Sequence, residues 1–95
     1  MIINIAYQSS KNRKKDINSV LGIKNSRRDI YEYDGMLISY NKNLFQINTL
    51  LSKNIDLDFL IKILNVVFKN ETVGISGIAN KDSLLGVQNV KIYWS

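Results

Sequence analysis

Apolar and polar positions along this chain predict a succession of strands and two helices. Residues 2 to 7 (IINIAY) are dense in β-branched side chains, which is typical of a central strand buried on both faces. Residues 72 to 78 and 89 to 94 also have strand-like patterns. The second of these segments places Val90, Ile92 and Trp94 on one face, which we expect to point inward.

The clearest local signal is a hairpin at Asp34-Gly35, because Asp-Gly supplies both positive-φ positions of a type I′ turn. Residues 29 to 33 and 36 to 40 form its two strands. The turn at residues 41 to 43 then leads into residues 44 to 51, so a three-stranded meander is predicted. The hairpin separates two sets of side chains, with Tyr31, Tyr33, Met36, Ile38 and Tyr40 on one face and Ile30, Glu32, Leu37 and Ser39 on the other.

Two segments have helical periodicity. A short helix is predicted near residues 16 to 21, where Asp16 can cap the N-terminus and Gly22 can take the left-handed position after the end. Its apolar face consists of Ile17, Val20 and Leu21. A longer helix is predicted over residues 57 to 69, with Asp56 as its N-cap and Asn70 after its end.

The longer helix is apolar over more than half of its circumference. Its narrow polar stripe consists of Asp58, Lys62, Asn65 and Lys69. A helix on one sheet needs an apolar face only somewhat wider than about 100°. The flank with Phe59, Ile63 and Val66 therefore needs a second cover, which is either the short helix and loops or another chain, such as a second copy in a homodimer.

The order of elements is β-α-β-β-β-α-β-β, which predicts an α+β fold. In this two-layer arrangement, one long and one short helix cover one face of a mostly antiparallel sheet of five to six strands. With 95 residues, 45% of them hydrophobic, we expect a single globular domain spanning residues 1–95. The absence of cysteine fits the reducing cytoplasm. The apolar run at the N-terminus is too short for a signal peptide or a spanning helix, so no membrane association is expected.

The composition also carries a genetic signal. Ile, Asn, Lys and Tyr, whose codons are A/T-rich, supply 41 of the 95 residues, whereas Ala, Pro, Gly and Arg together supply 10. An AT-rich gene indicates a low-GC bacterium, a phage or a mobile element.

Histidine and cysteine are both absent. Serine triads, thiol enzymes and typical zinc hydrolases are thereby excluded, and we expect a non-enzymatic protein without metal or cofactor. A carboxylate-based nuclease or transferase remains the enzymatic alternative. Asp56 and Asp58 form a D-x-D pair that helix capping explains better than cation binding. Gly74 and Gly77 match G-x-x-G between strand-like flanks, whereas KH domains place that motif between helices.

The segment from residue 11 to residue 28 is strongly basic. It has seven cations against the carboxylate of Asp16, while the whole chain has a net charge of +5, so the remainder is close to neutral. The seven cations are Lys11, Arg13, Lys14, Lys15, Lys24, Arg27 and Arg28. Residues 11 to 15 are predicted to be an exposed loop before the short helix. Cations there oppose the helix dipole, so stability does not favour this arrangement.

Two functions fit these features. The first is a binding protein that contacts nucleic acid or a nucleoprotein complex through residues 11 to 28, with Tyr31 and Tyr33 on an open sheet face where bases can stack. The alternative is a protein-directed inhibitor, such as an immunity protein, antitoxin or anti-defence factor. Its basic segment would meet an acidic protein surface and the apolar helix flank would supply the central contact. Plain solubility is a further explanation for the lysines.

Overall fold

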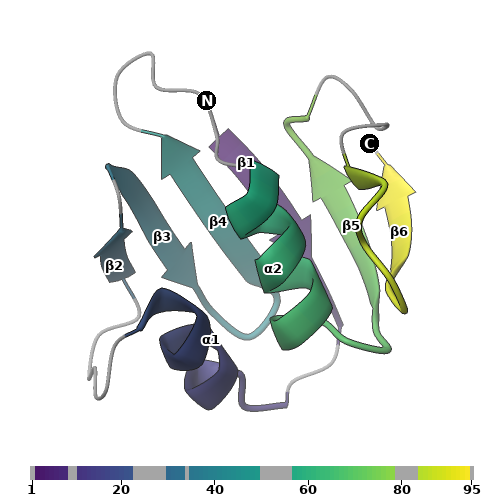
Figure 1. Cartoon of the computed structure of the whole chain (residues 1–95), viewed down its shortest axis with the longest axis horizontal. Coiled ribbons are helices and arrows are strands. Elements are labelled where there is room, and N and C mark those ends of the chain that lie inside the picture. The colour runs from purple at the N-terminus through teal and green to yellow at the C-terminus, as the bar shows by residue number, and fades with distance from the viewer. Residues whose placement is uncertain are drawn as a thin grey trace.

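The computed structural model describes residues 2–8, 11–22, 30–33, 35–49, 57–78 and 84–94. These residues form one six-stranded sheet with two helices on the same face (Figure 1). In chain order the elements are β1 (Ile2–Ala6), α1 (Lys14–Leu21), β2 (Ile30–Tyr33), β3 (Met36–Tyr40), β4 (Leu44–Thr49), α2 (Leu57–Val67), β5 (Thr72–Ser76) and β6 (Lys91–Trp94). The predicted α+β class and the predicted order of elements are confirmed.

The strand order across the sheet is β2-β3-β4-β1-β5-β6. Strands β2, β3 and β4 form the predicted antiparallel meander. Strand β1 is central, as predicted, and lies antiparallel to both β4 and β5. Strands β5 and β6 are parallel, so the chain crosses from one end of the sheet to the other between them. The sheet is therefore mostly antiparallel.

Strand β1 differs from the prediction in one respect, because only one of its faces is buried. Ile3 and Ile5 point into the core, whereas Ile2 and Ala6 are exposed. Both helices cover the same side of the sheet (Figure 1). Among the described residues, nothing covers the other side, which we call the open face.

The hairpin prediction is confirmed in its register. Tyr33 pairs with Met36 and Ile30 pairs with Ser39, which leaves a two-residue turn. Gly35 has a φ of 77°, as the turn requires. Asp34 lies outside the described residues. The next turn is held by the side chain of Asn41, whose Oδ1 accepts hydrogen bonds from the backbone N–H groups of residues 43 and 44.

Helix α1 begins at Lys14, which is two residues earlier than predicted. The backbone N–H of Lys14 donates to Asn12 Oδ1 at 3.0 Å. Its predicted apolar face is buried, and Gly22 has a φ of 72° at its end. Helix α2 ends at Val67, two residues earlier than predicted, and Asn70 has the expected left-handed φ of 62°. Asp56, the predicted N-cap of α2, lies outside the described residues.

Gly77 follows β5 in a conformation that excludes other residues. Its φ is 95°, and a Cβ atom placed there would lie 2.1 Å from the carbonyl oxygen of Ile2. A glycine is therefore needed where the chain leaves β5 and passes the start of β1.

Candidate functional site

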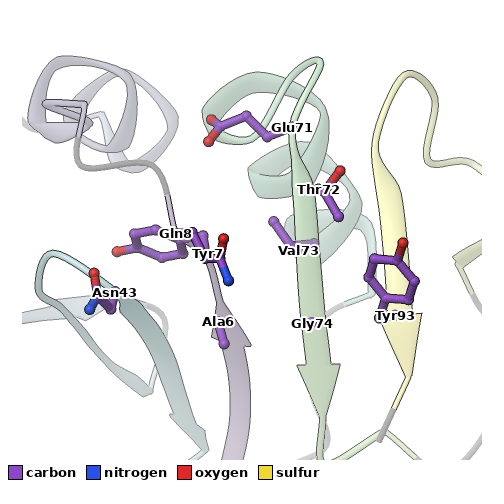
Figure 2. A pocket seen from close by; sticks show the side chains of 9 residues that line it. All are labelled: Ala6, Tyr7, Gln8, Asn43, Glu71, Thr72, Val73, Gly74 and Tyr93. Atoms are coloured by element: carbon purple, nitrogen blue, oxygen red, sulfur yellow. The ribbon is translucent and has the colours of Figure 1, made fainter.

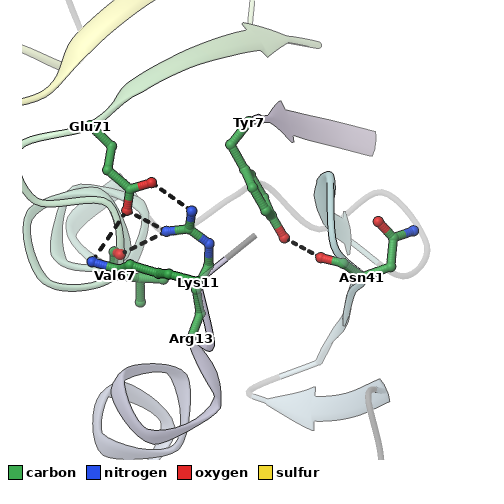
Figure 3. A network of polar contacts seen from close by, with 6 residues as sticks. All are labelled: Tyr7, Lys11, Arg13, Asn41, Val67 and Glu71. Carbon is green, nitrogen blue, oxygen red and sulfur yellow. Dashed lines mark hydrogen bonds and ion pairs between the residues drawn. The ribbon is translucent and has the colours of Figure 1, made fainter. Parts of the chain in front are cut away.

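Arg13 lies where the sequence predicted an exposed loop, but it is only 2% exposed. It occupies the position before α1, and its side chain reaches the end of α2 (Figure 3). Both terminal nitrogens donate to the carboxylate of Glu71, and Nη2 lies 2.5 Å from Oε1. Nη1 also donates to the carbonyl oxygen of Val67 at 3.3 Å. The prediction that Arg13 is a surface cation is therefore wrong.

Two aromatic rings enclose the guanidinium group. Its central carbon lies 4.3 Å from the ring centroid of Tyr7 and 4.8 Å from that of Phe68. A cation over an aromatic face is attracted by the quadrupole of the ring, and more strongly where water is excluded. The hydroxyl of Tyr7 in turn donates to the carbonyl oxygen of Asn41 (Figure 3). The pair thus links β1, α1, α2 and the turn before β4.

Electrostatics explain why a charge is tolerated in the core. Helix α2 has no basic residue in its last turn, and Arg13 supplies the cation there that a helix C-terminus favours. The hydrogen bonds from Arg13 lower the pKa of Glu71, against the opposing effect of its burial. Two parallel hydrogen bonds between an arginine and a carboxylate form a strong pair. Arg13 and Glu71 thus neutralise each other within the chain.

The two tyrosines predicted on an open sheet face lie beneath the helices instead. Tyr31 is buried and stacks on Tyr40, with ring centroids 6.5 Å apart. Tyr33 stacks on Phe59 of α2 at 4.9 Å. The faces of the hairpin were predicted correctly, but the prediction of which face is open is wrong. A nucleic-acid base therefore cannot stack on these rings in this structure.

The apolar flank of α2 is mostly covered by the chain itself. Phe59 is 5% exposed and stacks on Tyr33, Ile63 is fully buried in the core, and α1 packs against α2. Val66 alone of the three predicted contact residues is exposed, at 40%. The chain itself therefore covers Phe59 and Ile63, and the prediction that they form a self-association surface is wrong.

The remaining predicted cations fall into two groups. Lys11 is about half exposed, and its Nζ lies 3.6 Å from Glu71 Oε2. Lys14 is half-buried and Lys15 is exposed in the first turn of α1. The other three, Lys24, Arg27 and Arg28, lie outside the described residues.

Three further lysines lie at the same end of the fold, and the sequence prediction missed them. Lys42 sits in the turn next to Tyr7, whose backbone N–H donates to Asn43 O at 3.0 Å. Lys69 follows α2, two residues before Glu71. The backbone N–H of Lys91 donates to Glu71 O at 3.0 Å.

We call this region the cationic end, where β1 and β3 finish and β4, β5 and β6 begin (Figure 1). Its lysines are Lys11, Lys14, Lys15, Lys42, Lys69 and Lys91. Of the acidic side chains in the described residues, Asp16 and Glu71 lie here, whereas Glu32 and Asp58 lie toward the opposite end. Since Glu71 is held by Arg13, the cationic end has a marked excess of positive charge.

A groove of about 690 Å³ opens at the cationic end, between β1 and β5. Its lining residues are Ala6, Tyr7, Gln8, Asn43, Glu71, Thr72, Val73, Gly74 and Tyr93 (Figure 2). Pairing between β1 and β5 stops at Ala6 and Gly74, whereas Tyr7, the residue after β1, still donates its backbone N–H to Asn43 O in the turn before β4. Such a volume lies within the usual range for ligand sites.

The described residues contain no group of three His, Cys, Asp or Glu side chains placed to hold a metal ion. Asp58 is exposed in the first turn of α2, and its D-x-D partner Asp56 lies outside the described residues. No helix within the described ranges is long and apolar enough to cross a membrane.

Comparisons with known proteins give no assignment for this site. No protein-family model, no curated protein and no solved structure matches the chain. The geometry and the charge of the site are therefore the only guides to its function.

Proposed function

We propose that this chain is a non-enzymatic binding protein that contacts the phosphate backbone of a nucleic acid through its cationic end. The observation that carries the proposal is the gathering of six lysines from four separate segments at one end of the sheet. Composition alone would spread lysines over the whole surface. Placing so many at one end costs free energy through mutual repulsion, which an anionic partner would relieve.

The proposal changes the contact surface expected from the sequence. The surface is no longer one continuous basic segment, because Arg13 is neutralised inside the fold. Its place is taken by Lys42, Lys69 and Lys91 from other segments. Lys24, Arg27 and Arg28 lie outside the described residues, and the proposal does not depend on them.

Contacts of this kind make binding strongly dependent on salt, because each neutralised phosphate releases a counterion. If three to six lysines contact a single strand, the logarithm of the binding constant should fall with the logarithm of salt concentration with a slope of about −2 to −4. The sequence preference should be weak, since phosphate contacts carry no base information.

The experiment is fluorescence polarisation with a labelled single-stranded oligonucleotide at 50 mM salt and at two higher salt concentrations. The single variants Lys42→Glu, Lys69→Glu and Lys91→Glu should each weaken binding and make the salt slope shallower by about 0.7, the loss of one contact with a single strand. Lys62→Glu is the matched control, because it changes the net charge equally from the exposed surface of α2. Its effect should be much smaller.

Two results would count against the proposal. The first is an absence of wild-type binding to DNA or RNA at 50 mM salt. The second is that Lys62→Glu weakens binding as much as the three site variants, because the attraction would then come from net charge rather than from the cationic end.

The alternative proposal, a protein-directed inhibitor, has less support, since Phe59 and Ile63 are not available for a central apolar contact. It predicts co-purification with an acidic protein after nuclease treatment and no retention of nucleic acid. The AT-rich composition supports an origin in a phage or mobile element for either function, and the lack of cysteine supports a cytoplasmic location.

A further inference from the structure

We infer that the groove between β1 and β5 holds one base of a single-stranded nucleic acid, stacked on the ring of Tyr93. This inference rests on the proposed function, because it names the form of nucleic acid that the cationic end would take. The lysines of the cationic end would contact phosphates, and the groove would add a contact with a base.

Tyr93 offers the ring for stacking. It lies on the open face of the edge strand β6 and is 58% exposed, unlike Tyr7 and Tyr31, which are buried. The ammonium group of Lys91 lies 5.5 Å from the centroid of its ring. An exposed aromatic ring beside a lysine combines a stacking surface with a phosphate contact, as in single-strand binding grooves.

The positions next to Tyr93 leave room for a base. Its neighbour on β5 is Gly74, and the neighbour of Gly74 on β1 is Ala6. A Cβ atom placed on Gly74 would meet only one atom within 4 Å, the backbone oxygen of Tyr93 at 3.8 Å. Gly74 and Ala6 therefore carry little or no side chain beside Tyr93, and all three residues line the groove (Figure 2).

The walls of the groove provide polar groups and charge. Gln8, Asn43 and Thr72 line it and can donate or accept hydrogen bonds at the edge of a base. A lysine flanks each side, since Lys42 adjoins Asn43 on one wall and Lys91 pairs with Thr72 on the other. A strand crossing the groove could place phosphates near both lysines while one base enters between them.

A double helix does not fit this arrangement. Its bases are stacked on both faces and paired along their edges, so none can lie on Tyr93 without leaving the helix. Single strands present bases freely, and every base has a face that can stack, so sequence preference should remain weak.

The test compares two labelled strands of equal length and equal charge, a twelve-residue oligonucleotide and an abasic chain with the same number of phosphates. Wild-type protein should bind the oligonucleotide roughly 5- to 150-fold more tightly, which corresponds to one stacked base. Tyr93→Leu should remove this difference and leave affinity for the abasic chain unchanged. Ile30→Ala, another exposed apolar position on the open face, is the control and should change neither.

The outcomes separate this inference from the function on which it rests. If wild-type protein binds both strands equally, or if Tyr93→Leu weakens both equally, stacking in the groove is refuted while phosphate binding stands. If neither strand binds at 50 mM salt, the proposed function fails and the inference fails with it. Thermal unfolding of each variant confirms that lost binding is not lost folding.

Discussion

Arg13 and Glu71 lie 58 residues apart in the sequence, and they form two parallel hydrogen bonds at the base of the cationic end (Figure 3). The pair fixes the start of α1 against the end of α2 and the start of β5. It also removes from the surface a cation that the sequence assigned to ligand binding. The stability of the fold and the charge of the site are therefore connected at this pair.

Replacing Glu71 by glutamine should lower the free energy of unfolding by about 3 kcal/mol. The change leaves the guanidinium group of Arg13 buried without its counter-charge, and breaking a buried pair from one side is costly. Urea unfolding measures the effect. Glu32→Gln, at an exposed position on β2, is the matched control and should cost less than about 0.5 kcal/mol. Equal effects of the two variants would show that the pair contributes little.

Stability should also fall in acid because of Glu71. Its pKa is lowered in the folded protein, chiefly by the hydrogen bonds from Arg13, from an ordinary value of 4.5. The ionised carboxylate therefore contributes stability above pH 4.5, and this contribution is lost as the pH falls through the lower, folded-state pKa. Urea midpoints at pH 6 and pH 3 should differ more for the wild-type protein than for Glu71→Gln. Parallel curves for the two proteins would contradict this assignment.

Gly77→Ala should destabilise the protein by about 2 to 4 kcal/mol. The new Cβ would clash with the carbonyl oxygen of Ile2. Alanine would also have to adopt a φ of 95°, which is strained for any residue with a side chain. Gly22→Ala is the control, since its φ is 72° but no atom lies within 4 Å of the new Cβ. Only the left-handed conformation is penalised there, by about 1 kcal/mol. Similar losses for both variants would mean that the chain near Ile2 can shift.

Phe59→Ala should cost about 3 to 5 kcal/mol of stability, because the ring is buried between α2 and Tyr33. Val66→Ala, on the exposed part of the same helix, should cost less than about 0.5 kcal/mol. Thermal or urea unfolding of the isolated chain gives both values. A small cost for Phe59→Ala would indicate that this ring lies on a surface after all.

Local signals predicted much of the fold. The Asp-Gly pair predicted a turn of two residues, and the observed register contains that turn. Gly22 and Asn70 marked the ends of both helices because each takes a left-handed conformation that other residues disfavour. Alternation along the hairpin correctly divided its side chains between two faces.

The wrong predictions all concern contacts between residues that lie far apart in the sequence. Alternation shows that Tyr31 and Tyr33 share a face, but the side on which the helices pack decides whether that face is buried. Arg13 was expected at the surface because its partner, Glu71, lies far away in the chain. Lys42 and Lys91 join the cationic end only because of the directions in which their strands run. Local pattern contains none of this information.

Strand β1 joins the two parts of the sheet, since it alone contacts both β4 and β5. Ile5 pairs with Phe45 on one side and with Ile75 on the other, so the second contact must wait until residue 75 has been made. Until then, one edge of the most apolar strand stays unpaired, and such an edge is prone to aggregation. We therefore expect assembly to be slower than for a helical protein of this length, because its decisive contacts join distant parts of the chain.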